Sequence, residues 1–201
     1  MKVGVLGGTF DPIHNGHLIV AEEVRAGQNL SGIIFVPAGQ PCLKEGIPVS
    51  AAEHRVQMVR LAIADKADFE VSTLEVERPG PSYMVDTITE LRSRLEADDE
   101  IFLILGWGSL AELPQWQEPS QLITMCKLVA VSRPGYPRPN LRKLNALIPG
   151  LSKQTVIMEN LKVDISASVI RDRVSRGLSV RHLVPKAVNE YIKQHGLYAV
   201  D

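Results

Sequence analysis

Short apolar segments alternate with longer amphipathic segments along this chain. The short segments are rich in β-branched residues and predict strands at 3–6, 33–36, 69–76, 101–105, 128–131 and 155–158. The longer segments predict helices at 16–28, 50–64, 86–95, 168–176 and 185–195. Ser50 and Glu53 have the spacing of a capping box, which predicts that the second helix begins at Ser50.

The order of these segments predicts the fold class. Strands that alternate with helices are typical of an α/β protein with an open parallel sheet. Segment 101–105 is apolar throughout, as expected for a parallel strand that helices cover on both faces. We expect one domain over residues 1–201, with a small helical portion from about 166 to 201. In such sheets, ligands bind beyond the carboxyl ends of the strands.

Composition narrows the classes of function. The chain of 201 residues is 45% hydrophobic and 22% charged, which is typical of a folded globular protein. Lys and Arg number 22 against 23 Asp and Glu, and the resulting net charge of -1 gives no support for nucleic acid as a partner. No apolar stretch approaches the roughly 20 residues that span a membrane. We therefore expect neither a nucleic-acid partner nor a membrane partner.

Two further features indicate a cytoplasmic protein. Residues 3–6 are too few for a signal peptide, and no small-residue cleavage site follows them. Cys42 and Cys126 are too few for a disulfide framework and lack the spacing of a zinc site. We expect both to be reduced thiols.

The most informative stretch, residues 7–17, reads Gly-Gly-Thr-Phe-Asp-Pro-Ile-His-Asn-Gly-His and joins the first predicted strand to the first predicted helix. Backbone N–H groups at a helix start are unpaired and attract anions. Gly7 and Gly8 let a phosphate approach the main chain, and the imidazoles of His14 and His17 can donate to its oxygens. The chain lacks both the P-loop pattern and the Gly-x-Gly-x-x-Gly dinucleotide pattern. The stretch therefore predicts a different kind of phosphate site.

Three other features have an ordinary structural interpretation beside a functional one. Ser166, Ser168 and Arg171 form a helix cap with an arginine on the same face, typical of either a surface helix or a second phosphate contact. Lys44 is a solvated lysine or a phosphate ligand on a proline-rich loop. Trp116 is a packing residue or a platform for an aromatic ring.

The stretch at 7–17 resembles the signature of the nucleotidylyltransferase superfamily, whose fold is similar to the catalytic domain of class I aminoacyl-tRNA synthetases. From Val3 to about Tyr198, the chain resembles the bacterial nicotinate-nucleotide adenylyltransferase family. The resemblance extends through further motifs: Phe35-Val36-Pro37, Lys44, Glu53-His54-Arg55, Pro81-Ser82-Tyr83, Asp86-Thr87, Leu113, Trp116, Ser132-Arg133-Pro134-Gly135, Ile165-Ser166 and Ile170-Arg171.

The resemblance implies a Rossmann-like sheet of the nucleotidylyltransferase type and a specific reaction. The 5′-phosphate of nicotinate mononucleotide attacks the α-phosphorus of ATP, and pyrophosphate leaves. The nucleophile is already an anion, so catalysis consists mainly of positioning and charge neutralisation. The expected partners are ATP and nicotinate mononucleotide, and Mg²⁺ is expected on the polyphosphate.

The resemblance also assigns roles to residues. It implies that His14, His17, Lys44 and Arg171 act on the reacting phosphates. The implied ATP-binding set adds Gly7, Gly8, Thr9, Phe10, Gly16, Gly106, Ser166 and Ser168. The implied set for nicotinate mononucleotide comprises Lys44, Tyr83, Met84, Trp116 and Arg133.

The chain departs from the family pattern at three places. Gly108 stands where the family usually has an Asp that binds a ribose hydroxyl, so we expect weaker nucleotide binding. Cys42 and Leu43 precede Lys44 where Pro-His is common, so one expected donor is missing. Met84 replaces the usual Thr or Ser, which a backbone contact tolerates.

Alternatives remain open at this level. The same chemistry could act on nicotinamide mononucleotide or phosphopantetheine, although Trp116 and the Pro81-Ser82-Tyr83 loop favour a pyridine nucleotide. A nucleotide-binding sensor without turnover would also account for the altered positions. The sequence leaves open whether the chain forms a homo-oligomer.

Overall fold

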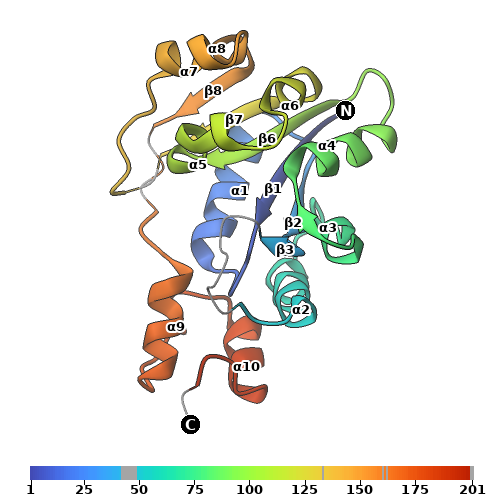
Figure 1. Cartoon of the computed structure of the whole chain (residues 1–201). Coiled ribbons are helices and arrows are strands. Elements are labelled where there is room, and N and C mark those ends of the chain that lie inside the picture. Colours follow the sequence, from blue (N-terminus) through green and yellow to red (C-terminus); the bar gives the residue numbers. More distant parts are fainter. Residues whose placement is uncertain (42–48, 133, 160, 162, 200–201) are drawn as a thin grey trace.

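The computed structural model describes residues 1–41, 49–132, 134–159, 161 and 163–199 of the chain. A six-stranded parallel sheet runs through its centre in the order β4-β2-β1-β6-β7-β8 (Figure 1). Its strands are β1 (Lys2–Gly8), β2 (Gly32–Pro37), β4 (Phe69–Val71), β6 (Glu100–Gly106), β7 (Lys127–Val131) and β8 (Thr155–Met158). A separate parallel pair consists of β3 (Gln40–Pro41) and β5 (Pro81–Ser82).

Helices connect the strands. They are α1 (Asn15–Gly27), α2 (Ala52–Ile63), α3 (Leu74–Glu77), α4 (Met84–Ser93), α5 (Trp107–Glu112), α6 (Pro119–Met125), α7 (Leu141–Leu147), α8 (Leu151–Gln154), α9 (Ala167–Ser175) and α10 (Lys186–Gln194), with a short 3₁₀ helix at Leu113–Gln115. Parallel strands need such crossovers because the chain must return to the end of the sheet where each strand begins.

Successive residues of each central strand pack into different hydrophobic clusters, because side chains of a strand point to alternate faces. On β6, Phe102 and Ile104 join a cluster that also contains residues of α1, α2 and α10. Ile101 and Leu103 of the same strand join a second cluster with residues of α4 and α6. Helices therefore cover both faces of the sheet, which confirms the fold class predicted from the apolar strand 101–105.

The strand order reverses next to β1. The chain runs from β1 outward to β2 and β4, then returns to place β6 on the other side of β1. Gly4 of β1 consequently pairs with Ile33 on one side and Phe102 on the other. In parallel α/β sheets this reversal opens a crevice beyond the carboxyl ends of the two strands, where ligands bind.

The C-terminal helices α9 and α10 lie at the end of the molecule opposite to α7 and α8 (Figure 1). Ile170 of α9 and Val188 of α10 are buried in the same cluster as Phe35 of β2. The backbone N–H of Asn15 donates to the carbonyl of Leu183 (2.8 Å), just before α10. The C-terminal portion is thereby attached to the start of α1.

Three sequence-based expectations need correction. Only residues 69–71 of the expected strand at 69–76 are extended, because Leu74–Glu77 turn into α3. Helix α2 begins at Ala52, and Ser50 does not cap it. Instead the Ser50 backbone N–H donates to Asp11, and its carbonyl accepts from Arg55. The short helices α5 to α8 were not predicted.

Two findings bear on the remaining compositional expectations. Among the described residues, every helix is too short or too polar to cross a membrane. Cys126 is a free, buried thiol, and burial raises its pKa to about 12, so it stays protonated at neutral pH. Cys42 lies outside the described residues.

Candidate active site

A cavity of about 460 Å³ lies at the carboxyl ends of β1 and β6, where the strand order reverses. Its walls come from the end of β1, the start of α1, the start of α4, the end of β6 and the segment after the 3₁₀ helix. Ten of the predicted site residues line it: Gly7, Gly8, Thr9, His14, Gly16, His17, Tyr83, Met84, Gly106 and Trp116. The structure thus brings residues far apart in sequence to one site.

The two histidines lie against each other at the start of α1. Their rings stack with centroids 3.7 Å apart and planes inclined by 17°. The backbone N–H of His14 donates to Nδ1 of His17 (3.2 Å), so the neutral His17 ring carries its hydrogen on Nε2. This helix cap fixes the tautomer of His17 and places its ring hydrogen on Nε2.

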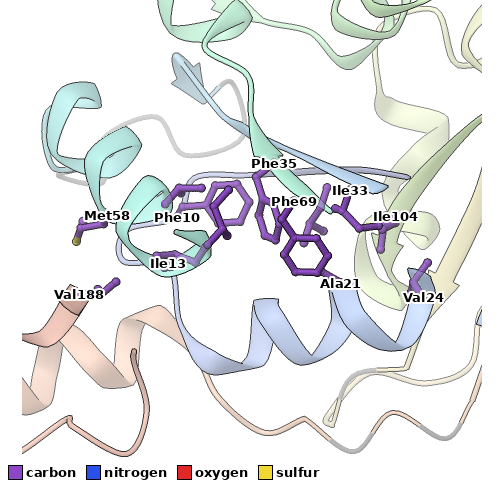
Figure 2. Packing of buried hydrophobic residues seen from close by; sticks show 14 of the residues in the cluster. Phe10, Ile13, Ala21, Val24, Ile33, Phe35, Met58, Phe69, Ile104 and Val188 are labelled. Carbon is purple, nitrogen blue, oxygen red and sulfur yellow. The ribbon is translucent and has the colours of Figure 1, made fainter. Parts of the chain in front are cut away.

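Phe10 packs against His17 from the hydrophobic core and does not line the cavity. Its ring is buried, and it meets His17 edge-on, with centroids 5.0 Å apart. Its other contact is Phe35 of β2, at 5.9 Å between centroids, within the cluster shown in Figure 2. The hydrophobic core therefore sets the position of His17, and the predicted role of Phe10 in ATP binding remains a prediction.

Asp11 ties the same loop to distant parts of the chain. Its carboxylate accepts from the hydroxyl of Tyr198 (2.6 Å) and from the backbone N–H of Ser50 (3.2 Å). Its backbone carbonyl accepts from Nη1 of Arg171 (2.7 Å). Burial, with the Asp11 carboxylate adding to it, raises the pKa of Tyr198, so the hydroxyl keeps its proton and remains a donor.

Arg55 of α2 is the charged residue that sequence reasoning left without a role. It is 2% exposed, and its guanidinium donates to four backbone carbonyls, those of Ser50, Thr9, Ala38 and Gly39, at 2.7 to 3.2 Å. Thr9 belongs to the histidine loop, whereas Ala38 and Gly39 follow β2. Burial lowers the pKa of Arg55, and the nearby Asp11 carboxylate partly offsets this effect. The motif Glu53-His54-Arg55 was the available signal.

A second part of the cavity wall is formed by Tyr83, Met84 and Trp116. Tyr83 and Met84 lie at the start of α4, where backbone N–H groups are free of helical partners. The indole of Trp116 lines the cavity and packs on the second hydrophobic cluster, and its buried Nε1 has no hydrogen-bond partner among the described residues. A Cβ on Gly7 would lie 2.6 Å from Cε of Met84, so the two walls meet at this glycine.

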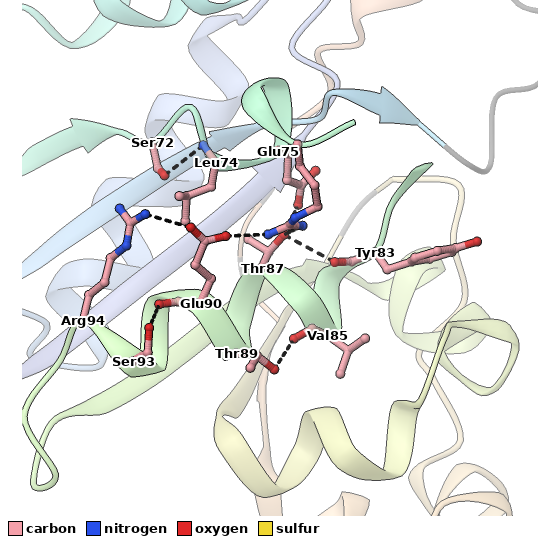
Figure 3. A network of polar contacts seen from close by, with 11 residues as sticks. Ser72, Leu74, Glu75, Tyr83, Val85, Thr87, Thr89, Glu90, Ser93 and Arg94 are labelled. Atoms are coloured by element: carbon pink, nitrogen blue, oxygen red, sulfur yellow. Dashed lines mark hydrogen bonds and ion pairs between the residues drawn. The ribbon is translucent and has the colours of Figure 1, made fainter. Parts of the chain in front are cut away.

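A buried acid, Glu75 of α3, also lines the cavity and was missed by the sequence reasoning. Desolvation raises the pKa of its carboxyl, while hydrogen bonds from Thr87 and Ser82 and the charge of Arg78 oppose the shift. Figure 3 shows Glu75 beside Thr87 on the first turns of α4. Its only sequence signal was the Pro81-Ser82-Tyr83 motif that it contacts.

The ring of Tyr136 occupies the space beside Gly108. A Cβ placed on Gly108 would lie 2.6 Å from Cε1 and 2.8 Å from Cδ1 of Tyr136. An aspartate at position 108 would therefore require the ring to move. Ser109, the next residue, lines the cavity and offers a hydroxyl at this wall.

Ser166, Ser168 and Arg171 are described by the structure and lie outside the cavity wall. Ser166 caps α9 through the N–H of Val169 and lies 3.1 Å from the hydroxyl of Ser168. These serines and Arg171 do not line the cavity, although Ile165, directly before them, does. Lys44 and Arg133 lie outside the described residues, so their predicted roles remain predictions.

Among the described residues, no cluster of three or more His, Cys, Asp or Glu side chains has the arrangement to hold a metal ion. Apart from the carboxyl of Glu75, the polar groups at the cavity are imidazoles, backbone N–H groups, hydroxyls and amides. This set of donors suits an anionic, aromatic ligand.

Comparison with known proteins gives consistent results. Residues 5–173 match the model of the cytidylyltransferase-like family. The chain is 46% identical over 198 residues to the probable nicotinate-nucleotide adenylyltransferase of Dehalococcoides mccartyi (strain CBDB1), covering 98% of this chain and 97% of that protein. It is 44% identical over 196 residues to the protein of the same name from Roseiflexus sp. (strain RS-1), with 98% and 97% covered.

Solved structures share the fold. The nicotinic acid mononucleotide adenylyltransferase of Plasmodium falciparum complexed with NaAD aligns with a TM-score of 0.77 at 16% identity, covering 98% of this chain and 97% of that one. The complex of the same protein with APC aligns with a TM-score of 0.74 at 18% identity, covering 98% and 96%. At these sequence identities, the structural similarity establishes the fold alone.

Proposed function

This chain belongs to the nicotinate-nucleotide adenylyltransferase family, within the cytidylyltransferase-like group, and from that premise we propose the reaction of its cavity. The protein transfers the adenylyl group of ATP to nicotinate mononucleotide, a step of NAD biosynthesis. The products are nicotinate adenine dinucleotide and pyrophosphate. The observation that carries the proposal is a cavity at the strand reversal with stacked histidines on one wall and Trp116 on the other.

The histidine wall holds the triphosphate. A phosphate oxygen of nicotinate mononucleotide forms a bond to the α-phosphorus of ATP as the bond to the β-phosphate bridging oxygen breaks. Pyrophosphate leaves with that electron pair. Nε2–H of His17 donates to the oxygens at the α-phosphorus, and His14 and the positive end of the α1 dipole add to the positive potential.

The wall that contains Trp116 holds the acceptor. The pyridine ring stacks on the indole of Trp116, and its carboxylate accepts hydrogen bonds from backbone N–H groups at the start of α4, near Tyr83 and Met84. Gly106 and Ser109 also line the cavity, and we assign the nucleotide riboses to this part of the wall. Lys44, Arg133 and the Ser166–Arg171 region complete the proposed set of ligands.

Mg²⁺ enters as part of the substrate. We propose that it arrives on the phosphates of ATP, keeps most of its water ligands and neutralises charge on the leaving pyrophosphate. We also propose that residues 1–201 act as one domain, since Ile170 and Val188 share a hydrophobic cluster with the sheet. We propose that this domain acts in the cytoplasm.

A pyrophosphate-release assay tests the function. The protein is incubated with ATP, Mg²⁺ and, in parallel, nicotinate mononucleotide, nicotinamide mononucleotide or phosphopantetheine. We expect turnover with nicotinate mononucleotide to exceed turnover with each of the other acceptors. Faster turnover with another acceptor would change the assigned substrate. ATP binding without turnover on any acceptor would make the protein a nucleotide sensor.

A further inference from the structure

Glu75 is a buried acid at the cavity that the phosphoryl chemistry does not use. It is 3% exposed, lies on the single turn of α3 and lines the cavity beside Ser82, Tyr83 and Met84. Burying a carboxyl group costs free energy unless hydrogen bonds compensate for the lost water. Two hydroxyl groups, those of Thr87 and Ser82, interact with the carboxyl of Glu75.

The first hydroxyl belongs to Thr87, on the first turns of α4. Thr87 Oγ1 donates to Oε1 of Glu75 at 2.7 Å (Figure 3). The same oxygen accepts from Nη1 of Arg78 at 3.2 Å. Because Arg78 can only donate, the single proton of the Thr87 hydroxyl has two acceptors, Oε1 of Glu75 at 2.7 Å and the backbone carbonyl of Tyr83 at 3.3 Å, and the bond to Glu75 is the shorter one. This bond ties Glu75 to the helix whose N-terminus faces the cavity.

The second hydroxyl belongs to Ser82. Ser82 Oγ accepts from the backbone N–H groups of Gly39 (3.1 Å) and Gln40 (3.2 Å), which follow β2. Its hydroxyl also interacts with the carboxyl of Glu75 and lowers the pKa of that group. A Cβ on Gly39 would lie 2.0 Å from the backbone carbonyl oxygen of Glu75, so the chain here packs directly on α3.

We propose that Glu75 is a positioning residue for the acceptor, which joins the start of α4 to the segment after β2 through Thr87 and Ser82. The proposal rests on the proposed function, because it assigns the start of α4 to the pyridine carboxylate. Glu75 acts through its neighbours and does not contact the reacting phosphates. It sets where the backbone N–H groups near Tyr83 and Met84 point.

The substitution Glu75→Gln tests this role. A glutamine keeps the shape but replaces one acceptor oxygen by an NH₂ group, which can only donate. Both hydroxyl oxygens already accept other donors, so one of the two bonds is lost. We expect KM for nicotinate mononucleotide to rise roughly tenfold, with KM for ATP and kcat changed less than about twofold.

Glu77→Gln is the matched control. It removes the same charge from the same helix, but Glu77 is exposed and its carboxylate accepts from Thr73, away from the cavity. We expect both KM values to stay at the level of the unchanged protein. A second pair separates hydroxyl loss from side-chain shape: Thr87→Val raises the acceptor KM as Glu75→Gln does, and Thr87→Ser does not.

The outcomes are distinguishable. If the unchanged protein shows no turnover with nicotinate mononucleotide, the proposed function fails. If it does turn over, and Glu75→Gln leaves the acceptor KM unchanged or raises both KM values equally, the role of Glu75 is overturned. If Glu75→Gln does not fold, the Thr87 pair makes the same measurement, and equal acceptor KM values for its two variants overturn the proposal.

Discussion

The two walls of the cavity are built in different ways. The histidine wall comes from one continuous stretch, residues 7–17, held by a helix cap, by the core residue Phe10 and by bonds to Asp11. The acceptor wall is assembled from α3, the start of α4 and the segment around Trp116. Groups that stabilise charge during reaction need a rigid, local frame. Groups that select a substrate are gathered here from separate segments.

Arg55 connects the two walls. It donates to the carbonyl of Thr9 in the histidine loop and to those of Ala38 and Gly39, on the acceptor side. Gly39 in turn donates to Ser82. The walls are therefore held together through backbone groups. Because the two walls are assigned to different substrates, side-chain variants on one wall should still affect different kinetic constants from variants on the other.

His17→Ala provides the largest expected effect and tests the histidine wall. It removes a donor whose tautomer is fixed by the N–H of His14, so transition-state stabilisation is lost. We expect kcat to fall at least ~10²-fold. Steady-state kinetics on both substrates measure this, and circular dichroism checks the fold. A loss confined to KM would contradict the assigned role.

Trp116→Ala tests the acceptor wall. Loss of the stacking surface should raise KM for nicotinate mononucleotide roughly tenfold, as expected for an aromatic platform, and leave KM for ATP unchanged. The control is Trp107→Ala, since Trp107 packs on the same hydrophobic cluster but does not line the cavity. It should lower the melting temperature without changing the acceptor KM. Equal weakening of both substrates by Trp116→Ala would make this tryptophan structural.

The difference between the walls also explains what the sequence could predict. The stretch at 7–17 is continuous and follows an apolar strand, so its placement at a helix start could be predicted. The roles of Glu75 and Arg55 could not be predicted from a continuous stretch, because their hydrogen-bond partners are distant in sequence. Arg55 and Thr9, for example, are 46 positions apart. Such a site becomes visible only when the chain has folded.

The same reasoning applies to the fold. The long apolar strands and the helices with several turns were predicted within a few residues. Helices such as α6, of seven residues, span two turns and leave little periodicity to detect. At 69–76 the β-branched residues favoured a strand, but Ser72 and Thr73 bond to the following turn and begin α3. Tertiary partners of Ser50 likewise outweighed its local capping signal.

Tyr198→Phe tests how the C-terminal segment supports the histidine wall, and its expected effect is smaller. It removes the hydroxyl that donates to Asp11, beneath the histidine loop. We expect the free energy of unfolding to fall by about 2 kcal/mol, the typical value of a hydrogen bond to a charged group. We also expect kcat to fall a few-fold, with the acceptor KM unchanged. Urea unfolding and steady-state kinetics measure the two effects.

Tyr191→Phe is the matched control for this prediction. Its hydroxyl bonds to Nδ1 of His54 (2.9 Å), in a partly buried contact between α10 and α2. This variant should lose stability and keep the kcat of the unchanged protein. If both variants lower kcat equally, the C-terminal segment supports the fold in general and not the histidine wall.

The smallest expected effect is a pH dependence of stability at the acceptor wall. Burial raises the pKa of Glu75 above its ordinary value of 4.5, although Thr87, Ser82 and Arg78 oppose the shift. The folded protein therefore binds the proton more tightly than the unfolded chain, and this contribution to stability is lost as pH rises through the folded-state pKa. Relative to Glu75→Gln, the free energy of unfolding of the unchanged protein should decline as pH rises above about 4.5. Urea unfolding of both proteins from pH 4.5 to 8 measures this difference in the free energy of unfolding. If the advantage of the protein with Glu75 grows as pH rises, the surrounding hydrogen bonds outweigh desolvation and the prediction is wrong.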